Sequence, residues 1–437
     1  MLKKIIFDII NKMKILSDVN HPKGLYLLFF TEMWERFSYY GMRALLVLYM
    51  IQQLMYSTEQ AGSVYGLYTG FVYLTPVFGG YIADKYLGQR KCVTVGMVLM
   101  CLGLFILSSG YHKLFLPSLF IMVIANGFFK SNISSILGLL YGDDNKKKDS
   151  GFTIFYMGIN LGALLSPLVC GTIAVKYGFN YGFMSAGIGM LLGTIIYKIY
   201  ENKFLGNFGK SPIKKIKVND GFERQKLTNT EKIKLSALFI LMGFTVIFWT
   251  CYEQAGCSLT MFAEYETRRR YFNHTIPTGY FQALNPLFII ILAPLASVLW
   301  AKLGEKNLEP TSIEKFTIAL GLMSFAYIIM SLAGELSQSC EVSPFWLVTT
   351  YLIMTIAELC ISPIGLSLVS KLAPKHLISV LMGTWFLTSF FGNIFAGIWG
   401  GKYGSISTDI LFLTLAIISF VSAVLLACLI PRYKNII

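Results

Sequence analysis

Apolar runs longer than about 18 residues recur from one end of this 437-residue chain to the other. A helix needs about 20 such residues to cross the hydrocarbon core of a bilayer, because each residue rises about 1.5 Å. Charged residues make up only 14% of the chain, well below the roughly 25% of soluble domains. The pattern therefore predicts an all-α protein that crosses a membrane many times.

Polar breaks divide these runs into twelve predicted spans. Their approximate bounds are 24–51, 58–83, 91–109, 114–140, 150–175, 179–199, 233–264, 279–303, 313–334, 343–372, 376–401 and 407–431. The longest break follows the sixth span, so the predicted domains are a cytoplasmic segment (1–23), a six-helix bundle (24–199), a cytoplasmic linker (200–232), a second six-helix bundle (233–431) and a cytoplasmic tail (432–437). Thr228 and Glu231 have the spacing of a capping box at the start of the seventh span.

Basic residues gather in alternate short loops. With the N-terminus inside, 28 of the 37 lysines and arginines lie in inner segments and six lie in outer loops. The positive-inside rule then predicts that both termini are cytoplasmic. We expect the protein in the plasma (inner) membrane. This placement accounts for the net charge of +14 without a nucleic-acid partner.

Two further features of the sequence concern metal binding and the N-terminal segment. The eight cysteines are scattered without metal-ligand spacing, so we interpret them as small buried apolar residues. The basic stretch 1–16 lacks a cleavage site for a signal peptidase, so we expect it to remain as a cytoplasmic tail or as a helix on the inner membrane surface.

The stretch TEMWERFSYYGMR, residues 31–43, carries charges inside the first predicted span. On a helix, its polar side chains fall within an arc of about 140°: Glu32, Glu35, Arg36, Tyr39, Tyr40 and Arg43. One charge facing lipid at mid-bilayer costs ~3 kcal/mol or more, so this stripe must face protein or water.

Three more charges lie in the middle of predicted spans, away from their ends, at Lys130, Glu253 and Glu358. Together with the first span they give three cations and four carboxylates, so one bound proton would make the set neutral. Arginine does not release its proton, whereas burial and nearby cations tune carboxylates. We therefore expect the carboxylates to carry a proton; the alternative is that the charges only pair to lock helices together.

The two halves of the chain echo each other after their second spans, in GGYIADKYLGQRK (79–91) and LWAKLGEK (299–306). Two six-helix halves with Ala83, Asp84, Gly88, Arg90 and Lys91 between spans two and three resemble the major facilitator superfamily. The resemblance implies two bundles that rock about a central cavity, with Asp84 and Arg90 in a latch at the inner face.

The segment EMWERFSYYG (32–41) resembles the E-x-x-E-R-F-x-Y-Y-G signature of the proton-dependent oligopeptide transporter family. Further segments resemble that family: GFFKSN (127–132), FTIFYMGINLGALLSP (152–167), FWTCYEQAG (248–256), FQALNPLFIIILAP (281–294) and AELCISPIGLSLVSKLAP (357–374). The resemblance runs from about His21 to the end. Ser131 departs from it, because the family commonly has proline there, which predicts a straighter fourth helix. The linker is too short and too charged for two extra helices.

The resemblance assigns roles to residues of this chain. Proton coupling would involve Glu32, Glu35, Arg36, Lys130 and Glu358. Arg36 and Lys130 would face the peptide carboxylate, while Asn160, Asn285 and Glu358 would hold its amino terminus. The peptide backbone would bond to Tyr39, Tyr40 and Tyr68, and side-chain pockets would be lined by Trp249, Ser362, Trp385 and Phe386. Arg43 with Glu253 would close an outer gate, and Lys130 with Glu358 would bridge the halves. Packing in the core is the alternative for Tyr68, Trp385 and Phe386, and helix–helix contact is the alternative for Asn160.

The function that the resemblance implies is proton-driven import of di- and tripeptides by alternating access. An alternative keeps the fold but carries another small solute, such as an amino acid, nitrate or a peptide-like compound. No nucleophile–base pair, metal cluster or phosphate loop indicates an enzyme, and no soluble domain indicates a sensor. The expected partners are peptide, protons and the lipid bilayer, with no cofactor and with the chain as a monomer.

Overall fold

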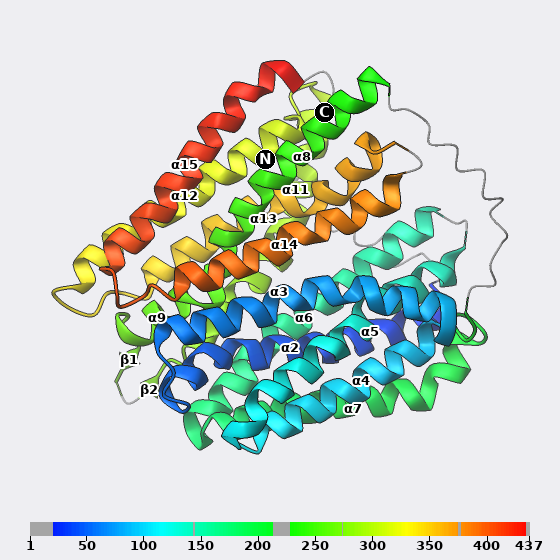
Figure 1. The fold of residues 1–437 in the computed structure, drawn as a ribbon, viewed down its shortest axis with the longest axis horizontal. Coiled ribbons are helices and arrows are strands. Elements are labelled where there is room, and N and C mark those ends of the chain that lie inside the picture. Colours follow the sequence, from blue (N-terminus) through cyan, green and yellow to red (C-terminus); the bar gives the residue numbers. More distant parts are fainter. Residues whose placement is uncertain (1–20, 143–144, 213–227, 273, 375–376, 434–437) are drawn as a thin grey trace. The chain divides into compact units, whose positions relative to one another are not determined.

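The computed structural model describes residues 21–142, 145–212, 228–272, 274–374 and 377–433. The predicted N-terminal surface helix, the middle of the linker and the last four residues lie outside the described residues. Helices dominate the described part, as Figure 1 shows, so the predicted all-α architecture is confirmed.

The first half of the chain forms six long helices. These are α2 (Lys23–Gln52), α3 (Thr58–Ile82), α4 (Gln89–Ser108), α5 (Phe115–Tyr141), α6 (Asn145–Tyr177) and α7 (Phe179–Leu205), with the short helices η1 (Ala83–Leu87) and η2 (His112–Leu114) between them.

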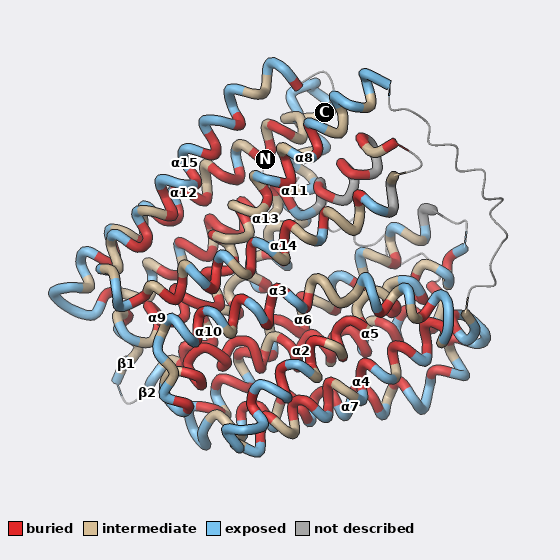
Figure 2. The backbone as a smooth tube through the Cα atoms, viewed as in Figure 1, coloured by how far each residue is buried: buried red, intermediate tan, exposed pale blue. Residues whose placement is uncertain are grey.

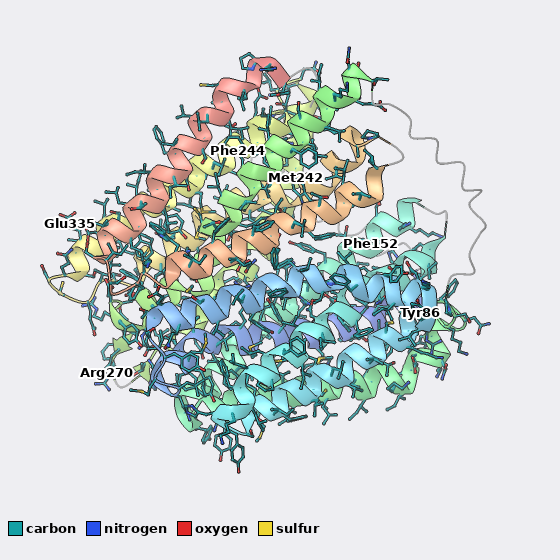
Figure 3. All side chains as sticks on the ribbon, in the orientation of Figure 1. Tyr86, Phe152, Met242, Phe244, Arg270 and Glu335 are labelled. Carbon is teal, nitrogen blue, oxygen red and sulfur yellow. The ribbon has the colours of Figure 1, made fainter. Side chains whose placement is uncertain are left out.

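The second half contains α8 (Asn229–Tyr252), η3 (Glu253–Gly256), α9 (Ser258–Tyr265), α10 (Gly279–Gln282), α11 (Leu284–Glu305), α12 (Ser312–Ser337), α13 (Phe345–Leu372), α14 (Ile378–Gly400) and α15 (Thr408–Tyr433). A small antiparallel hairpin, β1 (Arg270–Tyr271) and β2 (His274–Thr275), lies between α9 and α10, and Arg270 projects from it (Figure 3).

Ten helical segments of the described chain are long and apolar enough to cross a membrane. The two predicted spans that do not meet this criterion are those of α2 and α3. Helix α2 carries the charged stripe, and α3 is rich in glycine, threonine and tyrosine. Composition thus separates these two helices from the ten that contain an apolar stretch of membrane length, although both are long enough to cross.

The predicted seventh span is not one continuous α-helix. Helix α8 ends at Tyr252, and a 3-10 turn separates it from α9. The amide of Gln254 donates to the carbonyls of Thr250 and Ala396, which binds the turn to α14. At the other end of α8, the predicted capping box of Thr228 and Glu231 is confirmed. A second one, Thr311 with Glu314 at the start of α12, was not predicted.

The helices gather into two compact units. One contains Met1–Leu45, Thr75–Ile213 and Gln282–Glu309, and the other contains Leu46–Leu74, Lys214–Phe281 and Pro310–Ile437. Helix α11 therefore belongs with the first unit, and most of α3 belongs with the second. The domain bounds drawn at the linker stay a prediction. Within each unit, buried residues follow the helix faces that meet neighbouring helices (Figure 2).

Glycines set how closely the helices approach each other. In the first unit, a Cβ on Gly79 of α3 would lie 1.9 Å from the carbonyl oxygen of Gly127 on α5. In the second, a Cβ on Gly62 would lie 2.4 Å from the carbonyl oxygen of Gly397 on α14. Backbone atoms cannot rotate away from a new methyl group, so these crossings require glycine.

We expect Gly79→Ala to lower the melting temperature of the purified protein, because overpacking typically costs about 1–3 kcal/mol. The matched control is Gly243→Ala on α8, where a Cβ would meet nothing within 4 Å; this glycine lies between Met242 and Phe244 (Figure 3). Alanine has the higher helix propensity, so the control should keep or raise the melting temperature. Equal effects at both positions would contradict the close-packing argument.

His21 links the start of α2 to two other helices of the first unit. Its Nδ1 lies 2.8 Å from the hydroxyl of Tyr141, and its Nε2 lies 3.3 Å from the hydroxyl of Ser150. Neutral imidazole has one donor and one acceptor, which suits two hydroxyl partners. Burial and the nearby cation of Lys147 hold the pKa of His21 below its ordinary value of 6.5.

This lowered pKa predicts a pH-dependent contribution to stability. The unfolded chain binds the proton more readily than the folded one, so the contribution is complete above about pH 6.5 and is lost as the pH falls. Between about pH 7.5 and about pH 5.5, the melting temperature should therefore fall further for the wild type than for His21→Gln. An identical fall in both proteins would contradict this role of His21.

Candidate functional site

The charged stripe of α2 is buried inside the first unit. Glu32, Glu35 and Arg36 are 3%, 0% and 4% exposed. Charges taken out of water are costly unless they are paired and hydrogen-bonded. Ion pairs and a hydrogen bond of these three side chains offset this cost.

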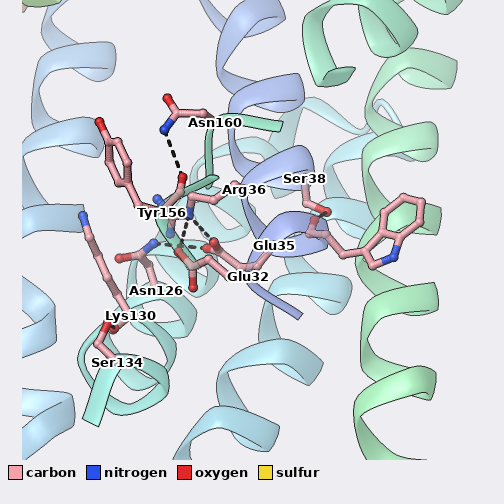
Figure 4. Close-up of polar contacts among 10 residues, drawn as sticks. Glu32, Glu35, Arg36, Ser38, Asn126, Lys130, Ser134, Tyr156 and Asn160 are labelled. Carbon is pink, nitrogen blue, oxygen red and sulfur yellow. Dashed lines mark hydrogen bonds and ion pairs between the residues drawn. The ribbon is translucent and has the colours of Figure 1, made fainter. Parts of the chain in front are cut away.

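Arg36 stands between the two glutamates (Figure 4). Its Nε lies 3.3 Å from Oε1 of Glu32, and it forms a second, shorter ion pair with Glu35. Asn126 on α5 donates to the other oxygen of Glu35, with 3.4 Å between Nδ2 and Oε1. Oε2 of Glu32 is buried without a hydrogen-bond partner among the described residues. One carboxylate is thus fully held, while the other keeps an oxygen that can accept a proton.

Aromatic rings continue the stripe toward the end of α2. The guanidinium of Arg36 lies 5.2 Å from the ring centre of Tyr39, and that of Arg43 lies 5.8 Å from the ring centre of Tyr40. The two tyrosine rings meet edge to face at 5.2 Å. These distances are in the range of cation–π contacts, which stabilise a cation that has lost part of its water.

Lys130 lies on α5, four residues after Asn126 and therefore on the same helix face. The two residues that follow it bind α5 to α3. The hydroxyl of Ser131 donates to the carbonyl of Pro76 at 3.0 Å, and the amide of Asn132 donates to the carbonyl of Gly79 at 3.3 Å. Ser131, the departure from the family pattern, thus makes a contact that proline could not make.

Helix α6 comes close to α2 because of Gly162, part of the predicted signature. A Cβ at this position would lie 2.3 Å from the carbonyl oxygen of Met33 and 3.1 Å from Cβ of Arg36. The amide of Asn160 donates to the carbonyl of Tyr156 on its own helix, at 3.0 Å (Figure 4). That bond lies within α6, so the contact with α2 at this point depends on glycine.

In the second unit, Glu358 of α13 accepts a hydrogen bond from the hydroxyl of Tyr252 on α8, at 2.6 Å. The ring of Tyr252 meets the indole of Trp249 at 5.3 Å. Glu358 thus has a neutral donor among its partners, and the carboxylates of α2 pair with a cation.

The predicted pocket residues of the second unit differ in exposure. Trp385 is 8% exposed and lies against Gly365, where a Cβ would meet its ring at 2.1 Å. Phe386 is 39% exposed, Ser362 is exposed, and Tyr68 is buried. The packing of Trp385 favours the core role that the sequence left open, while Phe386 and Ser362 remain accessible.

Several predicted pairs are divided between the units. Arg43 and Lys130 belong to the first unit, and Glu253 and Glu358 belong to the second. Asn285, near the start of α11, belongs to the first unit. The outer-gate pair, the bridge between the halves and the complete peptide site therefore stay predictions.

The two residues of the predicted inner latch, Asp84 and Arg90, bind different partners in the described structure, and the latch itself stays a prediction. Asp84 accepts from the amide of Gln89 at 2.9 Å. Arg90 is buried and pairs with Glu201 of α7, with 3.1 Å between Nη2 and Oε2. Arg90 also donates to the carbonyl of Gly206 at 2.8 Å, so it holds the first residues of the linker against α4.

Three residues that are partners of predicted site residues in the structure were not identified from the sequence. Asn126 precedes Lys130 by four residues, a spacing that could have marked it as a neighbour. Tyr252 stands directly before Glu253, but no local pattern points its hydroxyl toward a residue 106 positions away. Glu201 lies within the predicted linker (200–232), and its pairing with Arg90 depends on how α4 and α7 pack.

Comparisons with known proteins agree with this architecture. A family model described as the POT family matches residues 90–214 and 205–408. The chain belongs to the POT family. The signature on α2 lies outside the matched residues, so it supports the assignment independently.

Relatives and solved structures extend the match over most of the chain. A peptide transporter of Yersinia enterocolitica is 33% identical over 90% of each chain, and a di-/tripeptide transporter of Lactococcus lactis is 32% identical over 84% of this chain and 86% of that one. A crystal structure of a mutant peptide transporter POT in complex with alafosfalin has a TM-score of 0.89 and 32% identity, covering 96% of this chain and 98% of that one. The protein is a multi-pass membrane protein of the major facilitator fold, in a family of transporters.

We expect Glu201→Gln to destabilise this POT family member, because it leaves the buried cation of Arg90 without a counter-charge, a loss that costs about 3–5 kcal/mol for fully buried pairs. The control is Lys198→Gln, which removes the other ion pair of Glu201 from a side chain that is 50% exposed. Exposed pairs contribute about 0–1 kcal/mol. Melting temperatures in detergent measure both effects, and a similar small loss in both variants would contradict the assignment.

Proposed function

We propose that this protein imports di- and tripeptides by symport with protons, through alternating access and without chemical change of the peptide. The observation that carries the proposal is the buried group of Glu32, Glu35 and Arg36. It combines a fixed cation, a fully bonded carboxylate and a carboxylate oxygen that has no hydrogen-bond partner among the described residues.

The chemistry of the group suits proton coupling. Arginine stays protonated, so it cannot deliver a proton itself. A proton on Glu32 would cancel one of the two negative charges that face Arg36. The guanidinium would then attract a substrate carboxylate more strongly, because less of its charge is compensated by the protein. Loss of the proton would reverse this effect and favour release, so proton and peptide occupancy would rise and fall together.

The predicted contacts to the two ends of the peptide suit a zwitterion. Arg36 and Lys130 supply cations for a carboxylate, and Glu358, hydrogen-bonded to Tyr252, supplies an anion for an ammonium group. Every peptide has both ends and a backbone, so such a site would tolerate many side chains and limit length. Relatives that are named peptide and di-/tripeptide transporters support this substrate class.

The same proposal includes the membrane, the orientation, the oligomeric state and the coupling ion of the transporter. The excess of basic residues in alternate loops supports an inner-membrane protein with both termini in the cytoplasm. A chain of this fold contains both bundles that alternating access needs, which supports a monomer. We propose the proton as the sole coupling ion, with no cofactor.

The test uses purified protein in lipid vesicles, with labelled dialanine as substrate. An inward proton gradient should drive accumulation in the wild type, and a protonophore should abolish it. Glu32→Gln should keep counterflow exchange of dialanine but lose accumulation, because glutamine cannot take up the coupling proton. The control Glu59→Gln changes a side chain that is 73% exposed and should leave both activities intact.

Each failure has a distinct meaning in this assay. Dialanine uptake that ignores the gradient would contradict proton coupling. Absence of dialanine uptake would favour the alternative cargo, another small solute. Accumulation that survives in Glu32→Gln would move the proton to another carboxylate.

A further inference from the structure

The hydroxyl of Tyr252 contacts Glu358, a predicted peptide-binding residue, and the sequence predicted no role for Tyr252 itself. It belongs to the last residue of α8 and lies 2.6 Å from Oε2 of Glu358, near the middle of α13. A hydroxyl that donates to an ionised carboxylate at this distance makes a short, charge-assisted hydrogen bond. The bond joins two helices of the same compact unit.

The surroundings of Tyr252 fix its ring. Phe248 stacks on it with 5.9 Å between ring centres and 19° between planes, and Trp249 meets it at 5.3 Å and 90°. Phe248 is completely buried.

The backbone beside Tyr252 is held as well. The hydroxyl of Tyr327 on α12 donates to the carbonyl of Cys251 at 2.5 Å, just before α8 gives way to the 3-10 turn. A ring packed on two sides, on a backbone bound to a neighbouring helix, has little freedom to rotate. The position of the hydroxyl is therefore set before any ligand arrives.

A neutral donor has a different consequence from a cation. The phenol of Tyr252 orients the carboxylate of Glu358 through a hydrogen bond and adds no charge of its own. We propose that Tyr252 is a positioning residue that holds Glu358 in the orientation in which it binds the ammonium group of a peptide. This inference rests on the proposed function and adds a determinant of affinity to it.

The first test is Tyr252→Phe, which removes only the hydroxyl. With dialanine in counterflow exchange, KM should rise about tenfold while kcat stays within about twofold, since one bond to a charged group is lost from the binding step. The control is Tyr351→Phe, on the same helix as Glu358, whose hydroxyl donates to the carbonyl of Ala255 at 3.2 Å. It should leave KM unchanged, because its bond does not involve Glu358.

A double-mutant cycle separates positioning from general packing. The dissociation constant of dialanine is measured by calorimetry for the wild type, Tyr252→Phe, Glu358→Gln and the double variant. If Tyr252 acts through Glu358, its substitution weakens binding about tenfold in the wild type and less than about twofold in Glu358→Gln. N-acetyl dialanine, which has no ammonium group, should bind equally to the wild type and Tyr252→Phe.

Two outcomes would overturn the inference alone. One is normal wild-type uptake with an unchanged KM in Tyr252→Phe, and the other is an equal loss of affinity with and without Glu358. Failure of the wild type to take up dialanine would instead overturn the proposed function, together with the inference that rests on it.

Discussion

The requirement that buried charge be compensated governs this structure. Helix α2 carries two carboxylates and an arginine in less than two turns, all nearly inaccessible to solvent. In a medium of low dielectric, each of these groups would be strongly unfavourable alone. Arg36 compensates both carboxylates in part, and Asn126 completes the bonding of Glu35. One oxygen of Glu32 has no hydrogen-bond partner among the described residues, and the proposed coupling proton would bind there.

Close helix contacts make the charged group possible. Gly162 allows α6 to approach the backbone of α2 beside Arg36, and Gly79 allows α3 to approach α5 just before Lys130. Ser131 and Asn132 then add hydrogen bonds from α5 to carbonyls of α3. Because hydrocarbon does not favour helix association as water does, packing of small residues and such polar contacts supply much of the attraction. Gly162 thus brings α6 against the charged group, and Gly79 brings α3 against α5.

Glutamates in the two compact units bind different kinds of side chain. In the first unit a cation stands between two glutamates, and in the second a tyrosine hydroxyl holds Glu358. A cation reduces the local negative charge, while a hydroxyl leaves it intact and only orients it. In the proposed symport, the glutamates beside Arg36 in the first unit would respond to the proton. Glu358 in the second unit would bind the ammonium group of the peptide.

Much of the fold could be predicted because it depends on local chemistry. Long apolar runs specify helices of membrane length, the capping box at Thr228 starts α8, and six polar residues on one face of α2 must avoid lipid. The signature residues of α2 and the glycine of α6 also identified the family before any contact was known. The helices, the cap and the polar face follow from composition and spacing within single helices, whereas the family follows from the resemblance of these segments to known signatures.

Tertiary structure alone decided which of these groups meet. Arg90 pairs with Glu201 and not with Asp84, and Trp385 packs against Gly365 in the core. The hydroxyl of Tyr252 reaches Glu358 across 106 residues of chain. Such pairings depend on how far neighbouring helices are rotated and shifted along their axes where they pack, and no single helix determines that. The amino-acid sequence by itself determined which charges are buried and on which helix, whereas the packing of the helices determined the partner that compensates each one.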